Sequence, residues 1–405
     1  MTREFIDFVN AHENDDTARL LLSAARYPDI DMPSAVQQIE GRRTAREKWP
    51  SLLECEGFEY PPRLNREQAS SEATAQYKAR LLCTKRLQDF KTSGLQAGEC
   101  ACGLVDLHIA DLTGGMGIDS IAFARAGMTV DYVERDAGLC ALMERNCRAL
   151  GLDNVTVHCA DSLEWLETLN TEHLTLNNIY IDPARRAASG RKVAAFEDCE
   201  PDLLSCLPRL LGACSRLLVK ASPMIDIDLA CRQLGTVEEV HVVGLKGECK
   251  EVLFLCGGDA VEPTIKCFNL IFTRSQEAAT DPRFCASVGR YLYEPDATIM
   301  KGGPFNLICS WFGLEKLARN SHLYTSDERV GEFPGRCFEV LQELKLSRKA
   351  VAEALPEGKA HVVVRNYPVE AAVLQRQLGL REGGDLFVVA TTVGSRLTGF
   401  LCSRV

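Results

Sequence analysis

Acidic residues and glycines recur in the middle of the chain, each at the end of a short apolar run. Asp111 opens the segment DLTGGMGID, Glu134 closes TVDYVE, and Asp161 closes NVTVHCAD. A fourth run, NNIYID, ends at Asp182-Pro183. The carboxyl ends of parallel strands meet along one edge of a sheet, which is where α/β proteins bind their ligands. The spacing therefore predicts a pocket for an adenosyl cofactor at that edge.

Each of the four segments contains residues that could contact the cofactor or the group that reacts with it. The glycines at 114, 115 and 117 let the chain turn sharply and bring backbone amides close to a ligand, at the start of the helix IDSIAFARAG. Glu134 follows Asp111 by 23 residues and can accept hydrogen bonds from both ribose hydroxyls of a nucleoside. Asp161 can accept one from the adenine amine. Pro183 fixes the backbone just past the fourth strand and points Asp182 into the crevice.

In this order the four segments resemble the motifs of the class I S-adenosylmethionine-dependent methyltransferases. The resemblance implies S-adenosyl-L-methionine as cofactor and a methyl acceptor beside Asp182. Thr113 stands where many members have a first glycine, and Ala184 replaces the second proline of the usual D-P-P. The cofactor-binding residues that we assign on this basis are Asp111, Thr113, Gly114, Gly115, Gly117, Asp119, Glu134, Arg135, Asp161 and Ser162.

A nicotinamide-dependent dehydrogenase is the main rival for a glycine-rich turn. That class expects G-x-G-x-x-G, whereas this loop reads G-G-x-G and is followed by a D-P-A-R strand end. Further along, VEEVHVVGL and KEVLFLC are separated only by KGEC, which is too short for a crossover helix. They must pair as an antiparallel hairpin. An antiparallel last strand is typical of the methyltransferase sheet and not of a dehydrogenase sheet.

The periodicity predicts four regions. Residues 1–100 have apolar residues at helical spacing and form a helical domain, in which Ser70 or Ser71 caps a helix or, alternatively, Ser71 to Thr74 packs over the cofactor as a lid. Residues 101–258 alternate strands and helices, which predicts a Rossmann-like α/β sheet. Residues 259–330 form a small segment that includes a helix LEKLARN. Residues 331–405 follow a strand-helix-strand-helix-hairpin order, typical of a ferredoxin-like α+β unit.

The wording of YLYEPDATIMKGG and of VVVRNYPVEAAVLQRQLGLREGGDLFVVATT resembles bacterial methyltransferases that carry a small ferredoxin-like segment and a C-terminal THUMP-like domain. The resemblance implies an RNA substrate, tRNA or rRNA. By itself the sequence shows only a mildly basic module, in which an RNA-binding and an interdomain structural role are both open. The candidates for phosphate contact are Arg348, Lys349, Arg365, Arg376, Arg381 and Arg396.

Composition narrows the class of protein. The net charge is −10 and falls on residues 101–259, whereas the parts before and after carry −2 and +2. RNA must therefore be held by local basic groups. No run of about 18 apolar residues could span a bilayer, so we expect a cytoplasmic enzyme. The 18 cysteines include positions such as Cys159, Cys267 and Cys309 and contain no C-x-x-C, although Cys100-x-Cys102 is close. They are interpreted as reduced core thiols without a metal.

The acceptor strand limits the reaction. Methylation at carbon 5 of a pyrimidine needs a cysteine nucleophile, but the chain has Ala184 and VKASPMID at the expected places. A ring nitrogen or exocyclic amine needs only positioning and electrostatic support. We therefore favour the guanine exocyclic amine, with a protein or small-molecule acceptor and a non-catalytic RNA-binding role as alternatives. The catalytic candidates are Asp182, Pro183 and Arg185, and the substrate-binding candidates are Arg185, Arg186, Arg191 and Lys192.

Overall fold

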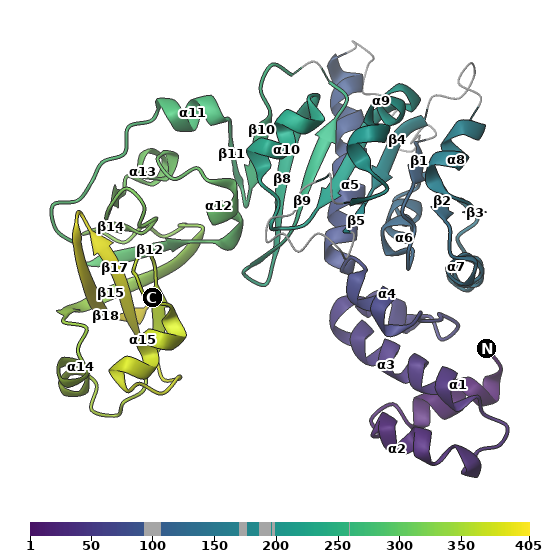
Figure 1. Ribbon diagram of the computed structural model, residues 1–405, viewed down its shortest axis with the longest axis horizontal. Helices are drawn as coiled ribbons and strands as arrows, with labels where there is room; N and C mark the ends of the chain where they lie inside the picture. The colour runs from purple at the N-terminus through teal and green to yellow at the C-terminus, as the bar shows by residue number, and fades with distance from the viewer. Residues whose placement is uncertain (93–106, 170–175, 186–195, 197–198, 259) are drawn as a thin grey trace. The chain divides into compact units, whose positions relative to one another are not determined.

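The computed structural model describes residues 1–92, 107–169, 176–185, 196, 199–258 and 260–405. These residues divide into two compact units (Figure 1). One comprises Met1–Val237 with Leu253–Asp259, and the other comprises Glu238–Val252 with Ala260–Val405. No described helix combines the length and the apolar character needed to cross a membrane. Cys100 and Cys102 lie outside the described residues.

The first unit begins with helices, as the periodicity predicts. Asp16 and Thr2 accept hydrogen bonds from backbone amides in the first turns of two of them, which is the usual capping arrangement. Ser71 caps the long last helix, because its Oγ accepts from Thr74 N at 3.2 Å. The elements are α1 (Arg3–Ala11), α2 (Thr17–Leu22), η1 (Ala24–Arg26), α3 (Met32–Lys48), η2 (Pro50–Glu54), α4 (Arg63–Gln68) and α5 (Glu72–Thr92).

A parallel sheet follows, with the strand order β3-β2-β1-β4-β7. Its strands are β1 (His108–Asp111), β2 (Thr129–Glu134), β3 (Val155–Cys159), β4 (Leu176–Ile181) and β7 (Cys214–Ala221). The connecting helices are α6 (Ile118–Arg125), α7 (Ala137–Leu150), α8 (Ser162–Thr168), α9 (Leu203–Ala213) and α10 (Ile227–Leu234). The short strands β5 (Ala184–Arg185) and β6 (Cys199–Glu200) form an antiparallel ribbon of their own.

Aspartates begin four of these helices. Asp136, Asp161, Asp202 and Asp226 each accept a hydrogen bond from a backbone amide of the first turn. A carboxylate there satisfies an amide that has no partner within the helix and favours the positive end of the helix dipole. Asp136, Asp161 and Asp202 each follow the preceding strand by two residues, and Asp226 follows β7 by five.

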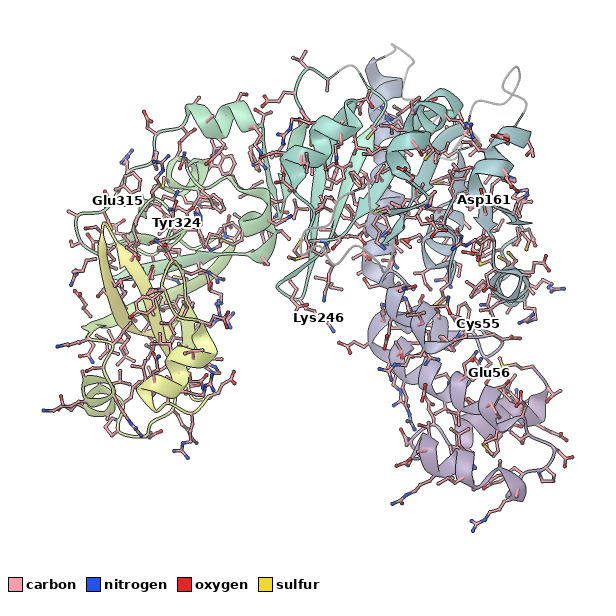
Figure 2. The ribbon with its side chains drawn as sticks, in the orientation of Figure 1. Cys55, Glu56, Asp161, Lys246, Glu315 and Tyr324 are labelled. Carbon is pink, nitrogen blue, oxygen red and sulfur yellow. The ribbon has the colours of Figure 1, made fainter. Side chains whose placement is uncertain are left out.

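The hairpin at the end of the sheet is confirmed. β8 (Val237–Leu245) and β9 (Glu248–Cys256) are neighbours, and β9 lies between β7 and β8. Only Lys246 and Gly247 separate the two strands, and both have positive φ (54° and 79°), which is the backbone of a type I′ turn. Lys246 stands at the tip of the hairpin (Figure 2). The reversed strand is the feature that separates a methyltransferase sheet from a dehydrogenase sheet.

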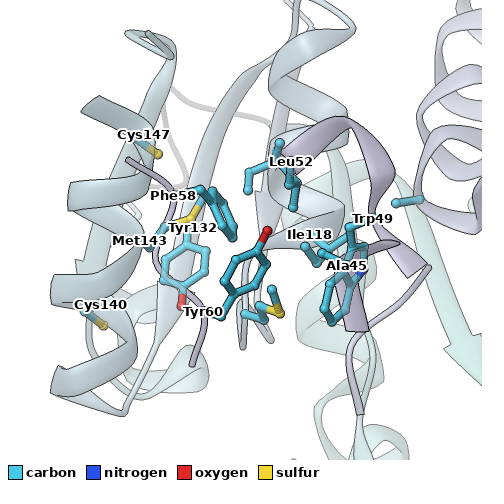
Figure 3. Close-up of a cluster of buried hydrophobic side chains, with 13 residues drawn as sticks. Ala45, Trp49, Leu52, Phe58, Tyr60, Ile118, Tyr132, Cys140, Met143 and Cys147 are labelled. Atoms are coloured by element: carbon cyan, nitrogen blue, oxygen red, sulfur yellow. The ribbon is translucent and has the colours of Figure 1, made fainter. Parts of the chain in front are cut away.

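The helical domain and the sheet share one core. Trp49, Phe58 and Tyr60, which lie between the N-terminal helices, pack with Tyr132 of β2 and Met143 of α7 (Figure 3). The same cluster includes Met116 and Ile118, which belong to the glycine-rich loop and the helix after it. Trp49 also donates its indole N–H to the carbonyl of Ser70 at 2.7 Å. The helices therefore support the predicted cofactor loop from beneath.

The second unit continues with β10 (Thr264–Cys267), which pairs in parallel with β8, and β11 (Leu270–Phe272). A separate sheet has the order β13-β14-β12-β15-β18-β17-β16. Its strands are β12 (Tyr291–Pro295), β13 (Glu315–Lys316), β14 (Tyr324–Ser326), β15 (Gly335–Leu344), β16 (His361–Val364), β17 (Leu386–Val393) and β18 (Arg396–Arg404). Its helices are α11 (Arg274–Ala279), α12 (Ala297–Gly302), α13 (Leu307–Phe312), α14 (Arg348–Ala354) and α15 (Ala371–Leu378).

The strand-helix-strand-helix-hairpin order of the last module is confirmed by β15, α14, β16, α15 and the β17–β18 pair. The prediction of a helix at LEKLARN, residues 314–320, is wrong. Gly313 ends α13 with φ of 64°, and Glu315 and Lys316 then pair with Thr325 and Tyr324 of β14. Pairing to a neighbouring strand outweighs the helical spacing of Leu314 and Leu317, which are both buried in this extended form.

Candidate active site

The four strand ends predicted from the sequence lie at one edge of the parallel sheet. β1 is flanked by β2 and β4, and β2 is flanked by β3, all in parallel. Asp111, Glu134 and Asp182 stand at or directly after the carboxyl ends of their strands, and Asp161 follows β3 by two residues. The sheet therefore brings the four predicted carboxylates to the same edge, with the glycine-rich loop between the first two.

Backbone hydrogen bonds hold the glycine-rich loop in place. Gly114 N donates to Val133 O at 3.0 Å, and Gly117 N donates to Gly114 O at 2.8 Å. A Cβ on Gly114 would meet the ring of Tyr132 at 2.3 Å, and one on Gly117 would meet Met143 Sδ at 2.4 Å. Gly117 also has a φ of 82°, a value that L side chains rarely adopt. Side chains are thus excluded beneath the loop by close packing.

Glu134 closes the loop on the β2 side. Its Oε2 accepts from Gly115 N and its Oε1 accepts from Asp136 N, both at 2.9 Å. A carboxylate has lone pairs for about four hydrogen bonds, so two backbone amides orient Glu134 and leave capacity for ribose hydroxyls. Arg135, predicted beside it, forms an exposed ion pair with Glu200 at 2.7 Å.

Asp161 is exposed at the start of α8, where Figure 2 labels it. Its Oδ1 accepts from Leu163 N at 2.9 Å and from Glu164 N at 3.3 Å. Ser162 is the first residue of α8. The capping bonds fix the Asp161 carboxylate at the start of α8, beside the carboxyl end of β3.

Asp111 is almost completely buried, with 1% of its surface exposed. It accepts from Ser120 Oγ at 2.6 Å and from Thr113 N at 3.1 Å. Burial raises the pKa of Asp111 to about 7, because desolvation outweighs these hydrogen bonds and the neighbouring carboxylates Asp119 and Asp182 add to the rise. A buried acid of this kind suits a cationic ligand, since a positive charge would restore the ionised form.

The raised pKa predicts a pH-dependent gain in stability for Asp111→Asn. A carboxyl group whose pKa is raised in the folded state stabilises that state fully at pH values below its pKa in the unfolded chain. This stabilisation is lost as the pH rises toward 7. The asparagine does not titrate, so its advantage over the natural residue should grow by on the order of 2–4 kcal/mol between pH 4 and pH 7. Urea unfolding of the cofactor-free protein at several pH values measures it. A flat difference between Asp111→Asn and the natural protein across this pH range would contradict the prediction.

A buried network that the sequence did not reveal joins α5 to the site. Lys78 is completely buried, and its Nζ lies 3.1 Å from Asp119 Oδ1. Asp119 Oδ2 accepts from Ser70 Oγ at 2.7 Å and from the Tyr180 hydroxyl at 2.9 Å. Burial would raise the pKa of Asp119, but the charges of Lys78 and Lys220 and the Ser70 bond outweigh it, and the pKa is lowered. Asp119 is therefore an anion beneath the loop.

Asp182 is held from two sides. Its carboxylate forms an ion pair with Lys220, at the end of β7. Its backbone amide donates to Thr113 Oγ1 at 2.7 Å, which explains the threonine at a place where many relatives of this fold carry glycine. Pro183 is buried behind it. Arg185 belongs to β5, while Arg186, Arg191 and Lys192 lie outside the described residues.

The sequence contains a pattern from which Lys220 could have been predicted as a site residue. It stands at the end of an apolar run, SRLLVKAS, and so marks a further strand end at the same edge. Lys78 had none, because it is one of several lysines and arginines on a long helix. Its neighbours Asp119 and Tyr180 become visible only when the helix is packed on the sheet.

The basic candidates of the C-terminal module differ in their surroundings. Arg365 pairs with the buried Glu294 at 2.6 Å, and Arg396 pairs with Glu343 at 2.5 Å. Arg376 and Arg381 donate to backbone carbonyls of Ala372 and Glu357. The remaining two, Arg348 and Lys349, are exposed at the start of α14. They are the candidates with the least competition from neighbouring acids.

Comparison with known proteins adds to this geometry. Two family models match the C-terminal part, one for a ferredoxin-like domain at residues 291–334 and one described as THUMP domain-like at residues 335–404. Two proteins of Mycobacterium tuberculosis, from strains CDC 1551 / Oshkosh and ATCC 25618 / H37Rv, are each 28% identical over 284 residues, which is 65% of this chain and 78% of the relative. Both are named uncharacterized S-adenosylmethionine-dependent methyltransferases.

Similarity to a solved structure extends further. A crystal structure described as a "putative methyltransferase" from Porphyromonas gingivalis W83 is 29% identical, covers 99% of this chain and 98% of its own, and has a TM-score of 0.82. The likeness therefore includes the helical domain and the C-terminal module as well as the sheet.

Proposed function

We propose that this chain, which belongs to the S-adenosylmethionine-dependent methyltransferases, transfers the methyl group to a nitrogen of an RNA base. The favoured acceptor is the guanine exocyclic amine. The observation that supports this proposal is the pair of contacts that Asp182 makes. Its carboxylate is paired with Lys220 and its backbone amide is bonded to Thr113. The acceptor side and the cofactor loop are thus joined through a few short contacts.

S-adenosylmethionine supplies an electrophilic methyl group on a sulfonium. Asp182 can accept a hydrogen bond from an amine proton and so hold the nitrogen in position. As the nitrogen attacks it gains positive charge, and the carboxylate stabilises that charge before the proton leaves. Lys220 keeps the carboxylate oriented. Pro183 shapes the backbone beside it, and its carbonyl is a second acceptor for the same amine.

A nitrogen acceptor is supported by the chemistry of the neighbouring side chains. Covalent methylation of a pyrimidine carbon needs a reactive cysteine close to the base. In the β5–β6 ribbon Cys199 pairs with Arg185 in register and is buried, a place that favours packing over nucleophilic attack. Serine in place of Cys199 should therefore leave methyl transfer intact.

An RNA substrate is supported by the C-terminal module. The THUMP domain-like match at residues 335–404 belongs to a class of domain associated with RNA-modifying enzymes, and residues 260–405 carry a net charge of +2 against −10 for residues 101–259. Arg348 and Lys349 are exposed there. We propose that they contact RNA phosphates. The RNA strand near Asp182 would be held by Arg185, Arg186, Arg191 and Lys192. The six residues Thr113, Gly114, Gly117, Asp119, Arg135 and Ser162 would line the cofactor side with Asp111, Gly115, Glu134 and Asp161.

Transfer of labelled methyl groups from S-adenosylmethionine to total RNA, followed by nucleoside analysis, tests the proposal. We expect label in a nitrogen-methylated guanosine, with an efficiency that falls steeply as salt rises. The double variant R348E/K349E should lose RNA methylation while retaining cofactor affinity, and C199S is the control that should retain both. Label in protein or in small molecules would favour the alternative acceptors. Label at carbon 5 of a pyrimidine would reject the nitrogen mechanism.

A further inference from the structure

Two cysteine side chains meet beside Glu134, the carboxylate assigned to the ribose. Cys159 is the last residue of β3 and the register partner of Glu134 on β2. Cys140, on the first turns of α7 (Figure 3), donates its thiol to the carbonyl of Glu134 at 3.2 Å. The backbone amide of Ala160, the residue after Cys159, donates to the same Glu134 carbonyl at 3.0 Å. The helix and the strand thus bring the two cysteines to one carbonyl group.

The two thiols differ in exposure. Cys140 is buried, whereas Cys159 is exposed, which corrects the expectation that Cys159 is a core residue. β3 is the outer strand of the parallel sheet, and for this reason the end of an apolar run there faces solvent. Cys267 and Cys309 are buried as expected. Burial, together with the contact to Cys159, raises the pKa of the Cys140 thiol to about 12.

We propose that Cys140 and Cys159 form a reversible oxidative modification site, at which a hydroperoxide converts the two thiols into a disulfide beside the cofactor pocket. The site is separate from methyl transfer and needs no residue of the acceptor side. Its effect on the cofactor rests on the proposed contacts of Glu134 and Asp161, whereas the bond itself does not.

The chemistry balances in two steps. The sulfur of the exposed Cys159 attacks one oxygen of the hydroperoxide, so that an S–O bond forms, the O–O bond breaks and an alcohol or water leaves. The sulfur of Cys140 then attacks Cys159, so that the S–S bond forms, the S–O bond breaks, and water leaves with the Cys140 proton. The two sulfurs lose two electrons in all, and the peroxide gains them. Exposure and burial set the order, since only Cys159 meets the oxidant.

The bond would alter the surroundings of Glu134. The thiol of Cys140 can no longer donate to the Glu134 carbonyl, and the end of β3 becomes tied to α7. Ala160 N, next to Cys159, donates to the same carbonyl at 3.0 Å, and Asp161 follows directly. Since the Cys140 thiol bonds to the Glu134 carbonyl and Asp161 follows Cys159 by two residues, we expect oxidation to lower cofactor affinity about tenfold, which corresponds to about 1.4 kcal/mol.

The test uses the full-length protein and hydrogen peroxide. After oxidation, free thiols are alkylated, and peptide mass analysis without reduction should find a Cys140–Cys159 peptide, two hydrogens lighter than the sum of its parts. Calorimetry with S-adenosylmethionine should show the tenfold loss, and a dithiol reductant should reverse both results. Before oxidation the C159S variant should bind the cofactor like the natural protein.

Matched variants separate the outcomes. C159S should form no link and keep its affinity after peroxide, whereas C147S, about two turns further along the buried face of α7, should behave like the natural protein. A peroxide-treated protein with both thiols still alkylated, or with Cys159 joined to another cysteine, would overturn the proposal. So would unchanged affinity in a fully linked sample. Failure of the reduced protein to bind the cofactor would instead count against the cofactor contacts, and the mass analysis would still decide the link.

Discussion

Replacement of Asp182 by alanine should lower methyl transfer by about a hundredfold or more and leave cofactor affinity within a few-fold. Its carboxylate is the group that we place at the reacting nitrogen, and loss of one charge-stabilising contact in an active site typically costs about 10²–10³ in rate. Its side chain forms an ion pair with Lys220 and takes no part in the loop that holds Glu134. Single-turnover rates with RNA and calorimetry with S-adenosylmethionine measure the two effects separately.

Glu134→Ala is the matched comparison at the same sheet edge. That change should weaken cofactor binding by about 1–3 kcal/mol through loss of charged hydrogen bonds, so the two variants should fail in opposite assays. Near-normal turnover in Asp182→Ala would remove Asp182 from the reaction. Equal losses of affinity in both variants would mean that the two carboxylates hold the same ligand.

Replacement of Lys78 by methionine should lower the free energy of unfolding by about 3–5 kcal/mol, which is the usual effect of removing one partner from a buried ion pair. Methionine fills a similar volume, so the loss comes from Asp119, which would remain buried beneath the loop with its Ser70 and Tyr180 contacts but without its cation. Urea unfolding in the absence of cofactor, with the slope checked against the natural protein, measures the change.

The double variant K78M/D119N tests the reason for that loss. Asparagine removes the charge that the methionine leaves unpaired, so the double variant should be more stable than K78M alone. If the two changes simply add, Lys78 acts through packing and not through Asp119. Ser70→Ala is a milder control, because it removes one hydrogen bond to Asp119 and leaves both charges in place.

Local signals predicted the strands and helices of the sheet well. The strands ending at Asp111 and Glu134 and the helix of residues 227–234 were predicted from apolar runs bounded by acids and glycine, and each of these signals acts within a few residues. The hairpin around Lys246 followed from loop length alone. These features need no knowledge of distant parts of the chain.

The features that the sequence missed depend on distant neighbours. Lys78 and Asp119 are 41 positions apart in the chain and meet only because α5 packs against α6. LEKLARN has helical spacing, but its Glu315 and Lys316 form the short strand β13 because β14 offers them backbone partners. Cys159 has the apolar neighbours of a core residue, and only its place on the outer strand exposes it. In each case tertiary contact overrides a local pattern.

The core shared by the helical domain and the sheet has a consequence during synthesis. Trp49, Phe58 and Tyr60 leave the ribosome before their partners Tyr132 and Met143 have been made. At about 5–20 residues per second, the roughly 90 residues between Trp49 and Met143 take on the order of 5–20 seconds. For that time these aromatic side chains lack the part of their core that the sheet and α7 supply. The nascent chain, more than the finished enzyme, is therefore the form of this protein most exposed to aggregation and most dependent on chaperones.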